Sequence, residues 1–460
     1  MAKLIDYSFA VGKEFNKKKA ESPEEYFEVA AQIHDYLETR KIETEDGIIW
    51  KDVIDLTTGG EISDDAVNLS QYAGSSGPLY YYLGLYEITK DEKYKELVLK
   101  AADYLNKNWK KQKKIARDNF DFKGIEYSFY LGIASVGTIL SKVYEAFKRE
   151  EDKNTIIEIT NEIINSADKT EAGLSWSHDK SPLAGGGTVL YLYKIYELLK
   201  DENILKAANK GADEIIAEAI KDERGGYAWT SYAHPNQTRV PNFECGTAGI
   251  GYVLAVAYEI SNDEKYLNAA KEAAKHIKAI AVKQGDGFLV PWHDNPDEKT
   301  IFYVSTCHGP AGTSRLFYQL YKDTKDSQYL DDIESLYKGV RHIGVPERQS
   351  AGYWNTVGIC CGTAGVVQFF INYYIITGRS DVKEAAELAG SILLGQKEKQ
   401  DKGVAWPLAF ERVKPQNLSR GISYAAGASG VGVALIQLYL LLEDKYKWIR
   451  LFDDPYPVAK

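Results

Sequence analysis

Two kinds of helical periodicity alternate along the chain. In the first kind, apolar residues rich in Tyr and Leu occupy most of the helix circumference, as in residues 188–199, 250–260 and 431–442. A helix with no polar face is typical of a position that is buried on nearly all sides. These segments therefore predict a set of inner helices.

The second kind of segment is amphipathic and begins at a polar residue. Four of these starts are Asp91, Asp201, Asp263 and Asp326. An aspartate at this point suits both the N-cap and the positive end of the helix dipole. Ser22, followed by Pro23 and then by Glu25, predicts a capped start for the first such helix. The amphipathic segments predict outer helices that pack on the inner ones.

A short third element recurs between each outer and inner segment. A glycine is followed by alternating apolar residues and an aromatic residue, in residues 47–50, 124–127, 173–176, 226–229, 287–292, 352–354 and 403–406. Alternation after a glycine turn predicts a short extended or hairpin segment.

Each inner segment is entered through a small-residue turn of the form Gly-x-x-Gly. The first residues of the seven turns are Gly74, Ala134, Ala184, Gly246, Gly309, Gly362 and Gly427, with spacings of about 50 to 65 residues. Glycine alone in such turns indicates only tight helix entry and close packing. A repeat of this length is typical of stacked helical hairpins. The sequence predicts an all-α fold, an α/α toroid of seven helical-hairpin repeats in one domain spanning residues 1–460.

All four cysteines of the chain fall in three consecutive turns of this repeat. Cys245 precedes Gly246, Cys307 and His308 precede Gly309, and Cys360 and Cys361 precede Gly362. Equivalent turns of a closed toroid meet at one mouth, so these side chains are expected to converge. A thiolate metal site is the leading hypothesis, and small buried apolar cysteines are the simpler alternative.

Charge and composition narrow the function classes. The formal net charge is −10, the pI is about 5.4 and the mean hydropathy is −0.35. An acidic chain without a Lys/Arg block argues against nucleic acid as a partner. The sequence contains neither a signal-peptide core nor an apolar run of membrane-spanning length, which predicts a cytoplasmic protein. Because that compartment keeps thiols reduced, metal binding or catalysis explains the cysteines better than disulfides do.

The cysteine turns resemble those of the lanthionine synthetase C-like family, the cyclases of lanthipeptide biosynthesis. The resemblance covers most of the chain and implies an α/α toroid with one Zn²⁺ at its mouth. Cys307 and Cys360 match two ligand positions, and Cys361 stands where many members carry His, so the resemblance implies Cys307, Cys360 and Cys361 as ligands. It also implies addition of a peptide Cys thiol to dehydroalanine or dehydrobutyrine, giving a thioether.

The chain departs from the family pattern where protons are handled. Cys245 replaces the His that many members carry before the repeat-four glycine, and Tyr303 stands in place of an Arg. His308 is the local replacement candidate, and Asp179 is an approximate match to a family acid. We therefore predict His308, Cys245 and Asp179 as catalytic residues. His234 and His293 lie in linkers and are more simply explained as loop residues.

Several functions stay open on the sequence alone. The first is a cyclase acting on a dehydrated precursor peptide, whose dehydration requires a separate dehydratase because the chain contains no such segment. Related readings are addition of a small thiol such as glutathione, or a peptide-binding toroid with a closed structural zinc in which Cys245 is the fourth ligand. The last is a carbohydrate-active α/α barrel that uses paired carboxylates, with Glu126, Asp179 and Glu244 as the available acids.

Overall fold

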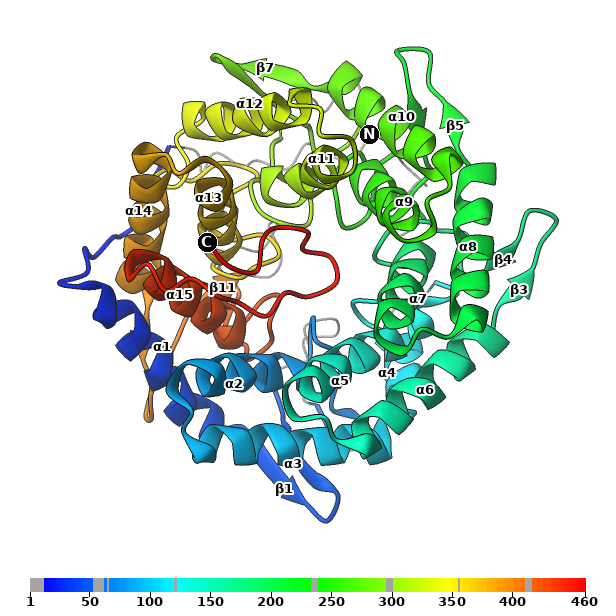
Figure 1. Ribbon diagram of the computed structural model, residues 1–460. Coiled ribbons are helices and arrows are strands. Elements are labelled where there is room, and N and C mark those ends of the chain that lie inside the picture. Colours follow the sequence, from blue (N-terminus) through cyan, green and yellow to red (C-terminus); the bar gives the residue numbers. More distant parts are fainter. Residues whose placement is uncertain are drawn as a thin grey trace.

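The computed structural model describes residues 12–52, 62–63, 66–119, 122–232, 239–294, 301–354, 356–409 and 416–460. Its helices form two concentric rings (Figure 1). The inner ring is α2 (Ser76–Thr89), α5 (Ile133–Phe147), α7 (Gly185–Leu199), α9 (Thr247–Ser261), α11 (Pro310–Thr324), α13 (Thr363–Thr377) and α15 (Ala428–Leu442). The outer ring is α1 (Pro23–Glu38), α3 (Glu92–Asn108), α6 (Glu150–Asn165), α8 (Glu202–Ala217), α10 (Glu264–Ile280), α12 (Gln328–His342) and α14 (Ser380–Gln396).

The ring is closed by contacts between its two ends. α15 packs against both α1 and α2, although these helices lie at opposite ends of the chain. The predicted α/α toroid of seven helical hairpins is thereby confirmed, with one additional helix, α4 (Lys111–Asn119), after α3. Among the described residues, no helix has the length and apolar character needed to cross a bilayer.

Most linkers between outer and inner helices are two-stranded antiparallel hairpins. They are β1 (Lys41–Thr44) with β2 (Gly47–Trp50), β3 (Asp168–Lys169) with β4 (Leu174–Ser175), β5 (Ile220–Lys221) with β6 (Tyr227–Ala228), β7 (Val282–Gln284) with β8 (Gly287–Leu289), β9 (Glu398–Lys399) with β10 (Val404–Ala405), and β11 (Leu408–Ala409) with β12 (Leu418–Ser419). The hairpin expectation is wrong at residues 124–127, which form the 3₁₀ turn η2 (Ile125–Tyr127), and at 352–354, where Ser350 and Tyr353 make one isolated bridge.

The recurring tryptophans of the linkers have a shared structural role. The indole N–H groups of Trp176, Trp229 and Trp406 donate to the carbonyl oxygens of Ile163, Ile215 and Leu393, at 2.7, 2.8 and 2.7 Å. Each carbonyl belongs to the end of the preceding outer helix. Because a buried indole requires an acceptor, this bond fixes each linker to its outer helix and sets where the next inner helix begins.

Helix starts differ from the sequence expectation in several repeats. The N-cap residue of α12 is Ser327 instead of Asp326, and the N-cap residue of α2 is Ser75 instead of Gly74. Asp91, Asp201 and Asp263 do cap outer helices through their carboxylates, but Ser22 makes no side-chain cap bond. In repeat two, the residue before the inner helix is Gly132, not Ala134. Ser135 occupies the place of the second glycine there, and its hydroxyl accepts the N–H of Gln71 at 2.6 Å, a bond that a glycine could not make.

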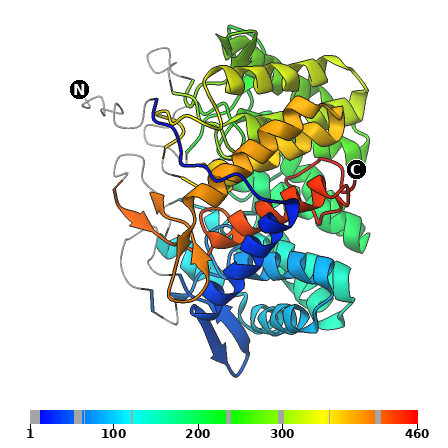
Figure 2. The same ribbon diagram turned by 90° about the vertical axis from the view of Figure 1, so that its left-hand side faces the viewer.

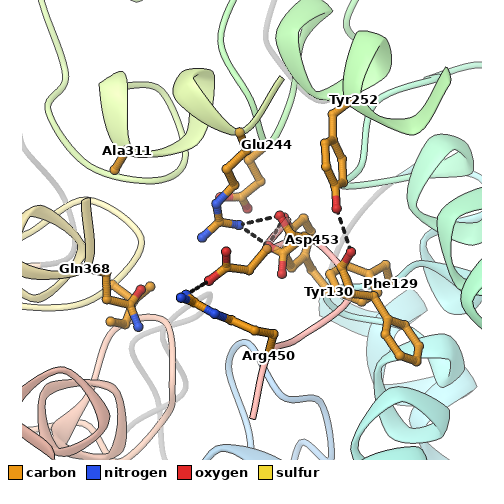
Figure 3. A network of polar contacts seen from close by, with 12 residues as sticks. Phe129, Tyr130, Glu244, Tyr252, Ala311, Gln368, Arg450 and Asp453 are labelled. Carbon is orange, nitrogen blue, oxygen red and sulfur yellow. Dashed lines mark hydrogen bonds and ion pairs between the residues drawn. The ribbon is translucent and has the colours of Figure 1, made fainter. Parts of the chain in front are cut away.

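The C-terminal segment after α15, residues 443–460, turns back into the centre of the ring (Figure 1). Figure 2 shows it at the opposite end of the toroid from the orange hairpins β9–β10 and β11–β12. Asp453 accepts a bond from the hydroxyl of Tyr130 at 2.9 Å and pairs with Arg315 at 2.5 Å, and the hydroxyl of Tyr252 donates to the Phe452 carbonyl at 2.9 Å (Figure 3). This segment closes the ring's centre.

Candidate metal centre and cavity

The turns that precede the inner helices are joined through their backbones. The N–H of Cys307 donates to the carbonyl of Cys360, and the N–H of Cys360 donates to that of Ala425, both at 3.0 Å. Equivalent bonds run from Ala425 to Tyr72 at 3.0 Å, from Glu244 to Cys307 at 2.9 Å and from Leu183 to Glu244 at 2.9 Å. These bonds therefore hold the turns of neighbouring repeats at the same level along the toroid axis. The side chains at this position consequently converge.

Three thiols meet on this backbone ring. The Cys361 sulfur lies 3.1 Å from the sulfur of Cys307 and 3.2 Å from that of Cys360, and all three sulfurs lie within 4.8 Å of one another. Zn–S bonds of about 2.3 Å in tetrahedral geometry place sulfurs roughly 3.8 Å apart. The Cys361 sulfur needs to move only about 0.6–0.7 Å further from each of the other two sulfurs to hold the ion, so this donor set fits zinc. Cys245 does not belong to the cluster.

Tyr72 and Glu244, from repeats one and four, make polar contacts with the cluster. The Tyr72 hydroxyl donates to the Cys360 sulfur at 2.7 Å and lies 3.4 Å from the Glu244 carboxylate, which is 3.6 Å from the same sulfur. Burial raises the pKa of Tyr72 well above its ordinary value, so the phenol keeps its proton and acts as the donor. Burial, and then the neighbouring Cys360, also raise the pKa of Glu244.

Sequence reasoning did not select Tyr72 as a site residue. A signal was present: Tyr72 stands two residues before the turn glycine Gly74. Glu244, Cys307 and Cys360 hold the same position relative to the glycines of their own turns. The signal was weak because the chain has 33 tyrosines, most of which pack in helices.

The cluster opens on a cavity of about 360 Å³. Its remaining lining is mainly aromatic and small apolar, and consists of Trp292, Tyr303, His308, Trp354, Thr356, Gly358, Leu408, Ala409, Ala425 and Ala426 together with Tyr72 and Glu244. A concave apolar site with a few convergent polar groups is the usual form of a ligand pocket.

A comparison with protein families shows to which family the chain belongs. The sequence model described as lanthionine synthetase C-like protein matches residues 65–451, which is most of the chain. The chain belongs to the lanthionine synthetase C-like family.

A comparison with solved structures supports the fold. A structure titled nisin cyclase is 14% identical, with a TM-score of 0.59, over 83% of this chain and 93% of that one. Two carbohydrate-active structures are less similar. D-mannose isomerase is 14% identical with a TM-score of 0.44, over 70% and 86% of the two chains. A glycoside hydrolase family 76 mannosidase from Bacteroides thetaiotaomicron is 16% identical with a TM-score of 0.38, over 67% and 85%. These two scores are too low to bear on function.

The three catalytic residues predicted for this lanthionine synthetase C-like protein occupy different environments. His308 lines the cavity, with its ring edge-on to Tyr303 at 5.4 Å. Cys245 is 6% exposed, is not among the lining residues, and has its pKa raised by burial. The Asp179 carboxylate accepts the backbone N–H groups of Ser181 and Tyr232, at 2.8 and 2.7 Å. Asp179 therefore holds loops in place, and of the three only His308 faces the cavity.

The carboxylates required by the carbohydrate-active alternative are not gathered at the cavity. Among Glu126, Asp179 and Glu244, only Glu244 lines it. Glu126 is paired with Arg117 at 2.8 Å. Two acids on opposite sides of a substrate are the requirement for glycoside hydrolysis, and among the described lining residues the cavity supplies one.

A second group of possible ligands is better explained as an ion cluster. Asp222, His276 and Asp294 come within 4.8 Å of one another. Arg224 pairs with both carboxylates, at 2.8 and 2.5 Å, and Arg239 also pairs with Asp222. Two guanidinium groups already balance the acids and would repel a cation. Of the linker histidines, His293 is 8% exposed beside Trp292, and His234 lies outside the described residues.

Proposed function

We propose that this protein is a zinc-dependent thioether-forming enzyme that adds a Cys thiol to dehydroalanine or dehydrobutyrine within a peptide. The observation that carries the proposal is the cluster of three thiols at the edge of a cavity. Family membership supports it. The substrate is a dehydrated precursor peptide, and we assign its dehydration to a separate protein.

Cys307, Cys360 and Cys361 would hold the ion. A zinc ion with three thiolates and an open fourth position binds a further thiol as its thiolate at neutral pH. The residues of the chain then have three tasks. The backbone ring keeps the ligands in register, Tyr72 donates to one ligand sulfur, and the aromatic lining excludes water from the reacting groups.

The bond changes define what the cavity must supply. A C–S bond forms between the peptide sulfur and the β-carbon of the dehydrated residue, while its Cα=Cβ π bond is lost. The thiol proton leaves sulfur and a proton is added at the α-carbon, so the mass is unchanged. His308 is the cavity-lining imidazole, and we assign proton delivery at the α-carbon to it.

Metal content is the first test. The purified protein is expected to contain one Zn²⁺ per chain by elemental analysis, and Cys307→Ala, Cys360→Ala and Cys361→Ala are each expected to lose most of it. Helical circular dichroism should persist in these variants, because the packed rings rather than the ion form the core. A matched control is Cys245→Ala, a buried cysteine outside the cluster. The proposal is wrong if the unaltered protein contains no stoichiometric zinc.

Activity is the second test. A peptide with one dehydroalanine and one cysteine should give a product of the same mass that no longer reacts with a thiol alkylator. His308→Ala should slow this conversion by about 10²–10⁴-fold while zinc is retained. Alkylation that persists across a peptide panel, with zinc bound, would instead favour a structural zinc.

A further inference from the structure

Four lining residues of the cavity form an apolar surface next to the thiols. They are Trp292, Tyr303, Trp354 and Leu408, which we call the aromatic wall. The Tyr303 ring lies 5.4 Å from that of Trp292 and 5.6 Å from that of Trp354, the latter edge-on. These rings pack in one cluster with Cys307, Cys360 and Cys361. An apolar group placed on the wall is thus beside the sulfurs.

The aromatic wall is held in place before any ligand arrives. The Trp354 indole N–H donates to the Ala409 carbonyl at 3.1 Å, across to the hairpin that carries Leu408. Trp354 is 2% exposed and Tyr303 is 7% exposed, so neither ring has room to turn away. A preformed apolar surface selects ligands that match it, because little ordering remains to be done on binding.

Lysine and arginine are absent from the described lining. None of the cavity-lining residues is Lys or Arg, and the only carboxyl group among them is Glu244. The guanidinium groups of Arg315 and Arg239 are paired with Asp453 and Asp222. Among the described lining residues, His308 is the one side chain that can offer a carboxylate a positive charge, and we assign its proton to the α-carbon. A carboxylate brought to the aromatic wall would therefore lose its water for little return from the described lining, which is unfavourable.

We propose that the aromatic wall is a specificity subsite that accepts an apolar or aromatic residue directly beside the reacting cysteine and disfavours thiols whose flanking residues carry carboxylates. The inference rests on the proposed function, since it concerns the same site. It favours a cysteine inside a longer peptide with apolar neighbours over a free tripeptide thiol such as glutathione, in which both residues that flank the cysteine bear a free carboxylate.

The test compares peptides that differ at one residue. Each carries one dehydroalanine and one cysteine at fixed spacing, with Leu, Phe, Gly or Asp beside the cysteine. We expect kcat/KM with Leu or Phe to exceed that with Asp by about tenfold or more, a difference that corresponds to the loss of one well-matched contact. In a second arm, N-acetylcysteine amide should add to a cysteine-free dehydroalanine peptide faster than glutathione does. Equal rates across the flanking residues would overturn the proposal.

The converse experiment places a positive charge in the aromatic wall. Leu408→Lys puts an ammonium group at the wall and is expected to raise the relative rate of the Asp-flanked peptide severalfold. Leu418→Lys is the matched control, because Leu418 lies in the paired strand of the same hairpin but is 41% exposed, and it should leave the preference unchanged. Circular dichroism and zinc content verify that both variants fold, and an unchanged preference in folded Leu408→Lys counts against the wall. If the variant does not fold, the peptide series decides.

A binding measurement separates this inference from the proposed function. Peptides with Ser in place of dehydroalanine cannot react, and calorimetry reports their affinity for the zinc-loaded protein. If no peptide cyclises but the Leu-flanked Ser peptide binds about tenfold more tightly than the Asp-flanked one, the function fails and the subsite stands. If all peptides cyclise with equal rates and bind equally, the function stands and the subsite fails.

Discussion

At the scale of single residues, the role of Cys245 decides whether the metal centre has an open fourth position or a fourth protein ligand. It is the fourth cysteine of the chain, but its sulfur is outside the three-thiol cluster and it is not among the cavity-lining residues. We expect Cys245→Ser to keep one Zn²⁺ per chain with affinity within about threefold of the original, as expected for a residue that makes no bond to the ion. Competition with a chromophoric chelator measures this. A loss of binding comparable to that in Cys361→Ser would make Cys245 a ligand.

Tyr72 provides a prediction about the surroundings of the ligands. Removing its hydroxyl in Tyr72→Phe deletes the 2.7 Å bond to the Cys360 sulfur, and loss of a hydrogen bond to a ligand typically weakens metal binding by about 10–100-fold. The control is Tyr130→Phe, from the same position of the next repeat, whose hydroxyl bonds to Asp453 instead. Chelator competition should show a large effect only at Tyr72. Equal affinities of the two variants would assign Tyr72 a packing role.

The residues that could be predicted are those whose type is rare. Four cysteines in a repeat register were enough to expect that thiols would converge, because the register alone fixes which turns meet. Tyr72 shares that register but not the rarity. Asp179 is predicted as a catalytic residue because it is an approximate match to a family acid, and this stays a prediction. Its carboxylate accepts two backbone N–H groups, and no side-chain pattern encodes such bonds.

At the scale of elements, the alternation of fully apolar and amphipathic segments was sufficient to predict both rings. The repeats that deviated did so through local contacts. Residues 124–127 form a 3₁₀ turn instead of a strand because Glu126 folds back to accept the Gly124 N–H at 3.1 Å and pairs with Arg117 on α4. Such contacts depend on the helix α4, which has no counterpart among the described residues of the other repeats.

The free energy of unfolding is expected to depend on pH through two carboxyl groups near the C-terminal ends of the inner helices α9 and α11. Asp323 of α11 shares the amide of Gln319 with Glu259 of α9, at 3.0 Å each. Burial, and then the charge of Glu259, raise the pKa of Asp323 to about 7. The folded protein thus binds a proton between about pH 4 and pH 7 that the unfolded chain has released, so this group lowers the free energy of unfolding as pH rises through that window.

We therefore expect Asp323→Asn to stabilise the protein above pH 7. After discounting for partial exposure, the gain in free energy of unfolding at pH 8 should be about 1–2 kcal/mol, and it should disappear near pH 4. Guanidinium chloride denaturation at both pH values measures it. Asp401→Asn, at an exposed position, is the control. A gain that is the same at both pH values would attribute the effect to packing instead of charge.

At the scale of the whole molecule, the C-terminal segment contacts inner helices that belong to several different repeats. Phe452 accepts a bond from Tyr252 of α9, while Asp453 contacts Arg315 of α11 and Tyr130, just before α5 (Figure 3). Residues 443–460 lie outside the sevenfold pattern, so no periodicity foretold where they go. A buried cation, Arg315, that requires a partner helps to determine their position.

The buried cation Arg315 is expected to contribute to the stability of the fold. Arg315 is 4% exposed and stacks 5.2 Å from the Phe243 ring, with Asp453 as its ion-pair partner. Arg315→Met leaves a buried carboxylate, and Asp453→Leu leaves a buried guanidinium, so each should lower the free energy of unfolding by about 3–5 kcal/mol. The double variant leaves neither charge and should lose clearly less than the sum of the two, which denaturant titration of all four proteins measures. Additive losses would mean that the segment is held by its apolar side chains alone. Strong coupling would mean that the charge of Arg315 on α11 determines the position of residues 443–460 in the ring.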